Sequence, residues 1–297
     1  MKDFDSSDKK MENVLFWIFG WFLSVLTMIG NGLVILLVCG RRQLRTETNA
    51  FIASLAVADF CVGISAIPLQ FFCILANGCK NRPTTSISYL SVMFIRVLFQ
   101  YASGANLCCL MLDRYIAVTK PLKYLTFMTR RRVIRIISLA WGIPLTVITL
   151  VASLRFTLNT SLLYKISGWL YACFDIPLCI ILIFCFVSMF RIVYKHERAA
   201  RILAKQLHFN HEVFIKTQGK STVKMMAVVV ALFLLCYIIF ARCSFILIIN
   251  HHNSCEDAVY KLPILVVNSA VNPLSYAIFK RDIRKELKRQ MHSIINI

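Results

Sequence analysis

The sequence predicts an all-α membrane protein, a seven-transmembrane helix bundle followed by a short C-terminal interfacial helix. Hydrophobic residues make up 58% of the 297 residues and charged residues only 16%, which is far from the composition of soluble domains. The apolar residues form seven runs, each long enough to cross a bilayer as a helix of about 20 residues. Since lipid offers the backbone no hydrogen-bond partners, these runs are expected to be helices.

Polar connections separate the seven runs. They are Val14–Cys39, Ala50–Ala76, Ile87–Val118, Ile134–Leu154, Ile166–Val193, Val223–Ile249 and Ala258–Phe279. The first run is too long for the core of a cleavable signal, so it is interpreted as the first span. We therefore expect a short extracellular N-terminus (1–13), a transmembrane domain (14–279) and a cytoplasmic amphipathic helix with a tail (280–297).

The distribution of basic residues predicts the orientation. With the N-terminus outside, 24 of the 34 Lys and Arg residues fall in cytoplasmic loops and the tail, as the positive-inside rule requires. Most of these charges are expected to be solvated beside anionic lipid head groups. The net charge of +20 therefore needs no nucleic acid to explain it. We expect a multi-pass protein of the plasma membrane.

Two motifs stand out inside this pattern. Asp113-Arg114-Tyr115, followed by Pro121, lies where the third run ends in basic residues. The seventh run contains Asn-Pro-Leu-Ser-Tyr at 272–276, where the proline permits a helix kink. At these positions both motifs resemble those of rhodopsin-like (class A) G-protein-coupled receptors. The resemblance covers nearly the whole chain, and the second cytoplasmic loop is most similar to the amine and trace-amine branch.

The resemblance implies a two-state bundle. Arg114 would be held by Asp113 at rest and released when the sixth helix swings outward to admit a heterotrimeric G protein; arrestin would be a further partner. Gly219 and Lys220 stand where an acidic residue often helps to lock the resting state, so signalling without ligand is expected. The implied activation and coupling residues are Asp113, Arg114, Tyr115, Pro121, Phe233, Pro273 and Tyr276.

A carboxylate in the second span needs a cation, a proton or several donors nearby. Asp59 lies in the middle of an apolar helix, where an ionisable residue is costly and tends to be functional. The resemblance implies a sodium-binding pocket centred on Asp59 and Ser103. Its residues would be Asn31, Asp59, Ser103, Asn268, Ser269 and Asn272. A buried hydrogen-bond network with a protonated Asp59 and no ion is the alternative.

The predicted ligand pocket carries an unusual charge. In amine receptors an Asp eighteen residues before the Arg of the triplet pairs with the ligand's ammonium, and here that residue is Arg96. Eighteen residues are five helical turns, so Arg96 lies on the same face as Arg114. Arg96 favours an acidic amphiphile held through its carboxylate. The expected pocket residues are Arg96, Gln100, Trp169, Cys173, Tyr237, Phe240, Leu262 and Val266.

Other ligand assignments remain open from the sequence. Arg96 could instead point outward or pair internally, for instance with Asp175 or Glu256. The receptor could also bind an amine or a short peptide in an atypical pocket. The sixth span departs from the family pattern as well, with Tyr237 where a Trp is usual and Ile239 where a Pro is usual.

The outer loops also depart from the family. Tyr89 stands where a Cys usually forms a disulfide with the second outer loop, and residues 155–165 contain no Cys. A bridge of Cys255 with Cys79 or Cys243 is an alternative, because sequence does not fix connectivity. Asn159, in Asn-Thr-Ser, is a predicted glycosylation acceptor.

Other function classes find little support in the sequence. It shows no metal-ligand cluster, nucleophile elbow or phosphate loop, so we expect no enzyme activity. Apart from the sodium ion, we expect no cofactor. Retinal is excluded because Val266 stands where opsins carry the retinal lysine. A multi-span transporter would predict inverted repeats and broken helices, and the sequence shows neither.

Overall fold

Helices make up all the regular structure in the part of the chain that the computed structural model describes. These residues are 2–76, 87–155, 157, 159–206, 227, 229–238, 249 and 258–295. In chain order the elements are α1 (Lys2–Gly40), the 3₁₀ turn η1 (Arg42–Leu44), α2 (Glu47–Ala66), α3 (Pro68–Leu75), α4 (Ile87–Thr119), α5 (Pro121–Phe127), α6 (Arg130–Leu154), α7 (Thr160–Gln206), α9 (Ala258–Phe279) and α10 (Arg281–Ile295). A further helical segment covers 229–238. The all-α prediction is confirmed.

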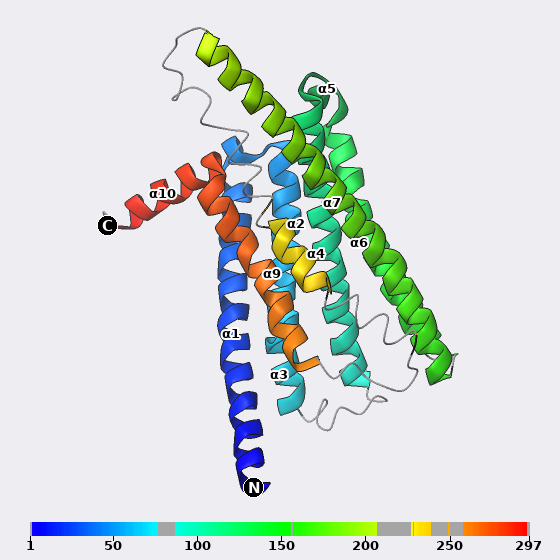
Figure 1. Ribbon diagram of the computed structural model, residues 1–297. Coiled ribbons are helices and arrows are strands. Elements are labelled where there is room, and N and C mark those ends of the chain that lie inside the picture. Colours follow the sequence, from blue (N-terminus) through cyan, green and yellow to red (C-terminus); the bar gives the residue numbers. More distant parts are fainter. Residues whose placement is uncertain are drawn as a thin grey trace.

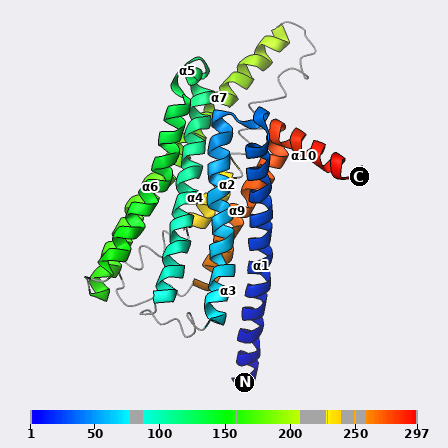
Figure 2. The same ribbon diagram turned by 180° about the vertical axis from the view of Figure 1, so that it is seen from behind.

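The long helices run side by side as a bundle (Figures 1 and 2). α5, α10 and the C-terminal part of α7 lie at one end of the bundle, and the N-terminus lies at the opposite end. α10 turns away from the axis of α9. The last turns of α4, which carry the triplet, therefore lie at the same end as α5 and α10.

Five of the described helices are long and apolar enough to cross a membrane. These segments are Val14–Gly40, Glu47–Leu75, Ile87–Thr119, Arg130–Leu154 and Lys165–Lys195. α9 coincides with the predicted seventh span, while the sixth is described only at 227, 229–238 and 249. Large apolar side chains such as Leu36, Ile180 and Phe184 are exposed on the outside of the bundle. Lipid would cover them in a bilayer.

The second span is interrupted rather than continuous. Thr46 caps α2 by accepting a hydrogen bond from the Asn49 backbone N–H at 3.3 Å. α2 ends at Ala66, and α3 starts at Pro68 after the single residue Ile67. Proline lacks an N–H and disfavours helical geometry in the residue before it. α2 and α3 are therefore separate helices, although Ile67 between them keeps αR backbone angles.

The core lies between the inner faces of the helices. α1 packs on α2 and α9, α2 packs on α4, and α4 packs on α6 and α7. Phe51, Leu55 and Met111 are fully buried in this core. Gly30 lets α1 approach α9 closely, because a Cβ at this position would lie 3.1 Å from Pro273. Small residues of this kind allow helices to pack tightly in membranes.

A disulfide is present near the C-terminal end of α3. Cys73 is disulfide-bonded. Eight other cysteines among the described residues are not part of a disulfide: Cys39, Cys61, Cys108, Cys109, Cys173, Cys179, Cys185 and Cys236. The sequence did not predict a bond at Cys73. The predicted pairings of Cys255 with Cys79 or Cys243 lie outside the described residues.

Candidate functional site

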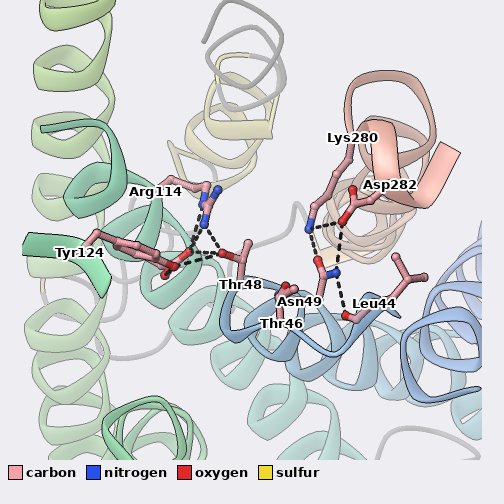
Figure 3. Close-up of polar contacts among 9 residues, drawn as sticks. Leu44, Thr46, Thr48, Asn49, Arg114, Tyr124, Lys280 and Asp282 are labelled. Atoms are coloured by element: carbon pink, nitrogen blue, oxygen red, sulfur yellow. Dashed lines mark hydrogen bonds and ion pairs between the residues drawn. The ribbon is translucent and has the colours of Figure 1, made fainter. Parts of the chain in front are cut away.

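The buried carboxylate of Asp113 organises the end of the bundle that carries the triplet (Figure 3). Its Oδ2 accepts hydrogen bonds from Arg114 Nε at 3.0 Å, Arg114 Nη2 at 2.6 Å and Thr48 Oγ1 at 3.2 Å. Its Oδ1 accepts one from the Tyr124 hydroxyl at 2.8 Å. Arg114 Nη2 also donates to Thr48 Oγ1. The arginine is therefore held by α4, and α2 contributes through Thr48.

Tyr124 reaches this cluster because the chain turns sharply after α4. The sequence predicted a polar connection between the third and fourth runs, whereas the structure has the short helix α5 there, with Pro121 at its first position. Proline is favoured there because its fixed φ suits a helix start and its missing N–H would have no intrahelical partner. Tyr115 points elsewhere, and its ring lies 5.7 Å from that of Phe184 in α7.

A second polar cluster joins α2 to the start of α10. Asn49 donates to the Leu44 carbonyl at 2.8 Å and to Asp282 Oδ2 at 3.2 Å. The Lys280 ammonium donates to Asn49 Oδ1 and lies 3.7 Å from Asp282. Figure 3 shows this cluster beside the Arg114 cluster, with Thr48 and Asn49 as neighbours on α2. The two clusters thus meet through α2.

Burial lowers the pKa of Lys280 from 10.5 to about 8, against the opposing effect of Asp282. Below pH 8 both folded and unfolded chains hold the proton, so the full cost of burying the charge is present. Between pH 8 and 10.5 the folded chain loses its proton first, so stability rises with pH. We expect wild type to gain about 1–3 kcal/mol over this window relative to Lys280→Met.

Thermal unfolding of the purified proteins in detergent at a series of pH values measures this gain. The difference between wild type and Lys280→Met isolates the lysine, because other groups titrate equally in both proteins. Parallel stability curves for the two proteins would contradict the prediction.

A central polar network surrounds Asp59. Asp59 is fully buried and accepts hydrogen bonds from Ser103 Oγ at 2.6 Å and Asn272 Nδ2 at 2.7 Å. Ser269 is fully buried, and its Oγ makes no hydrogen bond within the described residues. Asn31 Nδ2 donates to the Ser269 carbonyl at 3.1 Å, which ties α1 to α9. The last predicted member, Asn268, is buried as well.

The predicted switch residues lie deep in the bundle. Pro273, Tyr276 and Phe233 are buried, and the Tyr276 hydroxyl has no hydrogen-bond partner. Phe233 stacks on Tyr237, with ring centroids 4.2 Å apart. A buried hydroxyl without a partner costs free energy, so Tyr276 is poised to gain a hydrogen bond when its surroundings move.

The predicted ligand pocket is brought together only in part. Arg96 donates to Gln70 Oε1 of α3 at 3.0 Å, so it makes an internal contact; Glu256, one of its predicted partners, lies outside the described residues. Gln100 is buried, and its Oε1 has no partner. Tyr237 and Val266 are buried. At least one donor of Arg96 is therefore used in a contact with α3 rather than being directed at a ligand.

Two other predicted pocket residues face the wrong way for an enclosed site. Trp169 is 60% exposed and Cys173 is exposed, both on the outer side of α7. The opposite face of α7 carries Asp175, which is buried against α4. Burying this carboxylate fixes the rotation of α7 and leaves Trp169 and Cys173 outside. Leu262 lies in α9, but its side chain is not among the described ones. Phe240, Gly219 and Lys220 lie outside the described residues.

Asn159 lies where a glycan could be attached. It is exposed, and its Oδ1 accepts a hydrogen bond from the Leu162 N–H at 2.8 Å. It therefore caps the start of α7. The amide nitrogen to which a glycan would be linked is not the atom used for the cap. Glycosylation of Asn159 stays a prediction.

Comparison with known proteins gives the family. The profile of the seven-transmembrane receptors of the rhodopsin family matches residues 30–276. The chain is 27% identical to an octopamine receptor beta-2R of Chilo suppressalis over 90% of this chain and 77% of that receptor. It is 28% identical to a mouse trace amine-associated receptor 9, over 89% of this chain and 81% of that receptor.

A third relative is more similar over a shorter stretch. The chain is 36% identical to a Drosophila melanogaster dopamine D2-like receptor over 61% of this chain, which is 20% of that receptor's length. The match to the family profile covers most of the sequence and contains both motifs. The chain belongs to the rhodopsin family of seven-transmembrane receptors, which are G-protein-coupled receptors and not enzymes.

Proposed function

We propose that this receptor transmits the binding of an extracellular amine to a heterotrimeric G protein across the plasma membrane. The ion pair between the buried Asp113 and the partly buried Arg114, at the end of α4 beside the basic loops, is the observation that carries the proposal. The concentration of Lys and Arg at this end supports a cytoplasmic location for it and an extracellular N-terminus. Arrestin and anionic lipid are further proposed partners at the same end.

The proposed ligand class follows the relatives rather than Arg96. The relatives are receptors named for octopamine, trace amines and dopamine. An acidic amphiphile requires an arginine whose donors are available, yet Arg96 already donates to Gln70. A short-peptide ligand gains no specific support from the described residues. An amine is therefore the ligand class that we adopt.

The mechanism follows from the contacts of Arg114. In the described arrangement Asp113 neutralises the guanidinium and Thr48 shares it with α2. A G protein needs this arginine and the space around it, so the described arrangement corresponds to a resting state. A ligand activates by binding the alternative state more tightly, which shifts the population without pushing any one helix.

We also propose that a sodium ion binds at Asp59 in the resting state. Asn31 Oδ1 and Asn272 Oδ1 are buried without hydrogen-bond partners, and the side chains of both residues belong to the network around Asp59. A hard cation takes oxygen ligands. With the carboxylate and the Ser103 hydroxyl, these oxygens suit Na⁺. The ion would supply the positive charge that a buried carboxylate requires.

G-protein activation in cells that express the full chain tests the receptor proposal. We expect wild type to signal, either without ligand or with octopamine, dopamine, 5-hydroxytryptamine or 2-phenylethylamine. Arg114→Ala should abolish the signal at equal surface expression. Arg135→Ala is the matched control, because Arg135 is an exposed arginine in the first turns of α6 and should leave the signal intact. Equal signals from wild type and Arg114→Ala would overturn the proposed coupling role.

A further inference from the structure

A second buried carboxylate lies in the outer half of the bundle. Asp175, in the N-terminal third of α7, is 4% exposed. Its Oδ2 accepts a hydrogen bond from the Tyr101 hydroxyl of α4 at 3.4 Å, and the Tyr237 hydroxyl also hydrogen-bonds the carboxylate. Its Oδ1 is buried and has no partner. Two neutral tyrosine hydroxyls thus donate to a carboxylate that can carry a full negative charge, and one carboxylate oxygen has no hydrogen-bond partner.

Aromatic rings surround this carboxylate. Tyr101 stacks on Tyr171, with centroids 5.5 Å apart and the planes at 20°. Phe174 meets Tyr101 edge to face at 4.8 Å, and Tyr237 closes the group from the sixth helix. The faces of tyrosine rings attract cations, more strongly when water is excluded. A carboxylate ringed by aromatic faces disfavours an anion and favours a cation with N–H donors.

We propose that Asp175, with the rings of Tyr101 and Tyr171, holds the protonated amine of the ligand. The inference rests on the proposed function and specifies its binding residue. An ammonium would donate to the bare Oδ1 and neutralise the charge, whereas a buried carboxylate without a counter-charge is costly. The ammonium would also lie against the tyrosine faces, where the cation–π attraction adds to the ion pair.

This placement resolves the conflict created by Arg96. The family's amine-binding Asp belongs to the third span, and this chain carries the opposite charge there. The Arg96 guanidinium is directed to Gln70 of α3, while the acidic group lies on α7. The counter-charge for the amine has therefore moved from α4 to α7. Gln100, which immediately precedes Tyr101, offers a further buried acceptor without a partner.

The test uses the full receptor in cells and four amine probes: octopamine, dopamine, 5-hydroxytryptamine and 2-phenylethylamine. We expect at least one amine to activate wild type, and 2-phenylethanol, which lacks the charge, to fail. Asp175→Asn keeps an oxygen for the Tyr101 hydroxyl and removes only the charge. It should weaken the active amine by about 100-fold or more, as expected for loss of a buried charge partner.

Two substitutions at Tyr101 separate the contribution of its aromatic ring to amine potency from that of its hydroxyl. Tyr101→Phe keeps the aromatic face and should reduce potency by only about 2–5-fold, the equivalent of one ordinary hydrogen bond. Tyr101→Leu removes the face and should reduce it further. If Asp175→Asn does not reach the cell surface, the two Tyr101 variants still test the site. Equal potency of the amine on Tyr101→Phe and Tyr101→Leu would overturn the aromatic part of the proposal.

The outcomes separate the two proposals. If an amine activates wild type and Asp175→Asn with equal potency, the receptor assignment stands and the Asp175 site is overturned; Asp175 is then a neutral structural residue. If no amine activates wild type at measured surface expression, the amine ligand class is overturned and the Asp175 site with it. Loss of amine potency in Asp175→Asn, with response to 2-phenylethanol absent throughout, supports both.

Discussion

Asp113→Asn should raise G-protein activation in the absence of ligand. The substitution removes the negative charge that holds Arg114 at 2.6 Å and 3.0 Å. Hydrogen bonds to charged groups contribute about 1.5–3 kcal/mol each. A loss of about 2 kcal/mol from the resting state alone changes the equilibrium between the states by about 30-fold. A receptor that is active about 1% of the time would then be active about a quarter of the time.

Tyr124→Phe tests the same cluster with a smaller change. It removes one hydrogen bond, of 2.8 Å, to Asp113 Oδ1 and leaves the ion pair in place. We expect a shift of about 5-fold in the same equilibrium, from the loss of about 1 kcal/mol. In a second-messenger assay without ligand, we therefore expect the highest signal from Asp113→Asn, a lower one from Tyr124→Phe and the lowest from wild type.

Asp282→Asn is the matched control for charge. Asp282 is a carboxylate at the same end of the bundle, but it contacts Asn49 and Lys280 rather than Arg114. Its substitution should leave signalling near the wild-type level when surface expression is equal. Asp113→Asn signalling no higher than wild type would show that the Asp113–Arg114 pair does not restrain the receptor.

The fold could be predicted well because bilayer thickness dictates the length of each apolar run. The predicted run 87–118 agrees with α4 to within one residue, and 258–279 agrees with α9. The interruption between α2 and α3 at Ile67 and the helix α5 were missed. Both depend on the local effect of a proline, Pro68 or Pro121, inside or just after a run. The length of an apolar run does not predict where a proline interrupts or starts a helix.

The site could be predicted where the partners are neighbours in sequence or belong to a known motif. Asp113 and Arg114 are adjacent, and the structure places them in contact. Thr48 and Tyr124 were missed, because Thr48 meets Asp113 across 65 residues and Tyr124 reaches it only through the turn into α5. Such contacts depend on helix rotation, which hydrophobic length does not determine.

Asp175 was recognisable from the sequence as an acidic residue within a span, but its partners were not predicted correctly. Asp59, Asp113 and Asp175 are the acidic residues within the predicted spans, and an ionisable residue inside a span calls for a functional explanation. From the sequence, Asp175 was predicted only as one of two alternative partners for Arg96. The aromatic surroundings come from α4, α7 and the sixth helix together, so no single run of sequence displays them.

Sodium should stabilise the wild-type receptor and lower its basal signalling, and Asp59→Asn should lose both effects. An ion that binds only the resting state stabilises it by about 1.4 kcal/mol at ten times its dissociation constant. Asn at position 59 keeps an oxygen for the Ser103 hydroxyl, which donates at 2.6 Å, but cannot supply the negative charge. We therefore expect NaCl to raise the unfolding temperature of wild type and leave that of Asp59→Asn unchanged.

The comparison must hold ionic strength constant, because salt also screens the many exposed basic residues. Replacing NaCl by choline chloride changes the cation and leaves the ionic strength the same. Asp282→Asn again serves as the control, since it removes one carboxylate outside the spans and should keep the sodium response. A sodium response that persists in Asp59→Asn would place the ion elsewhere. A wild type without any sodium response would instead favour a protonated Asp59 within a closed hydrogen-bond network, which is the arrangement that needs no ion to offset the burial of its charge.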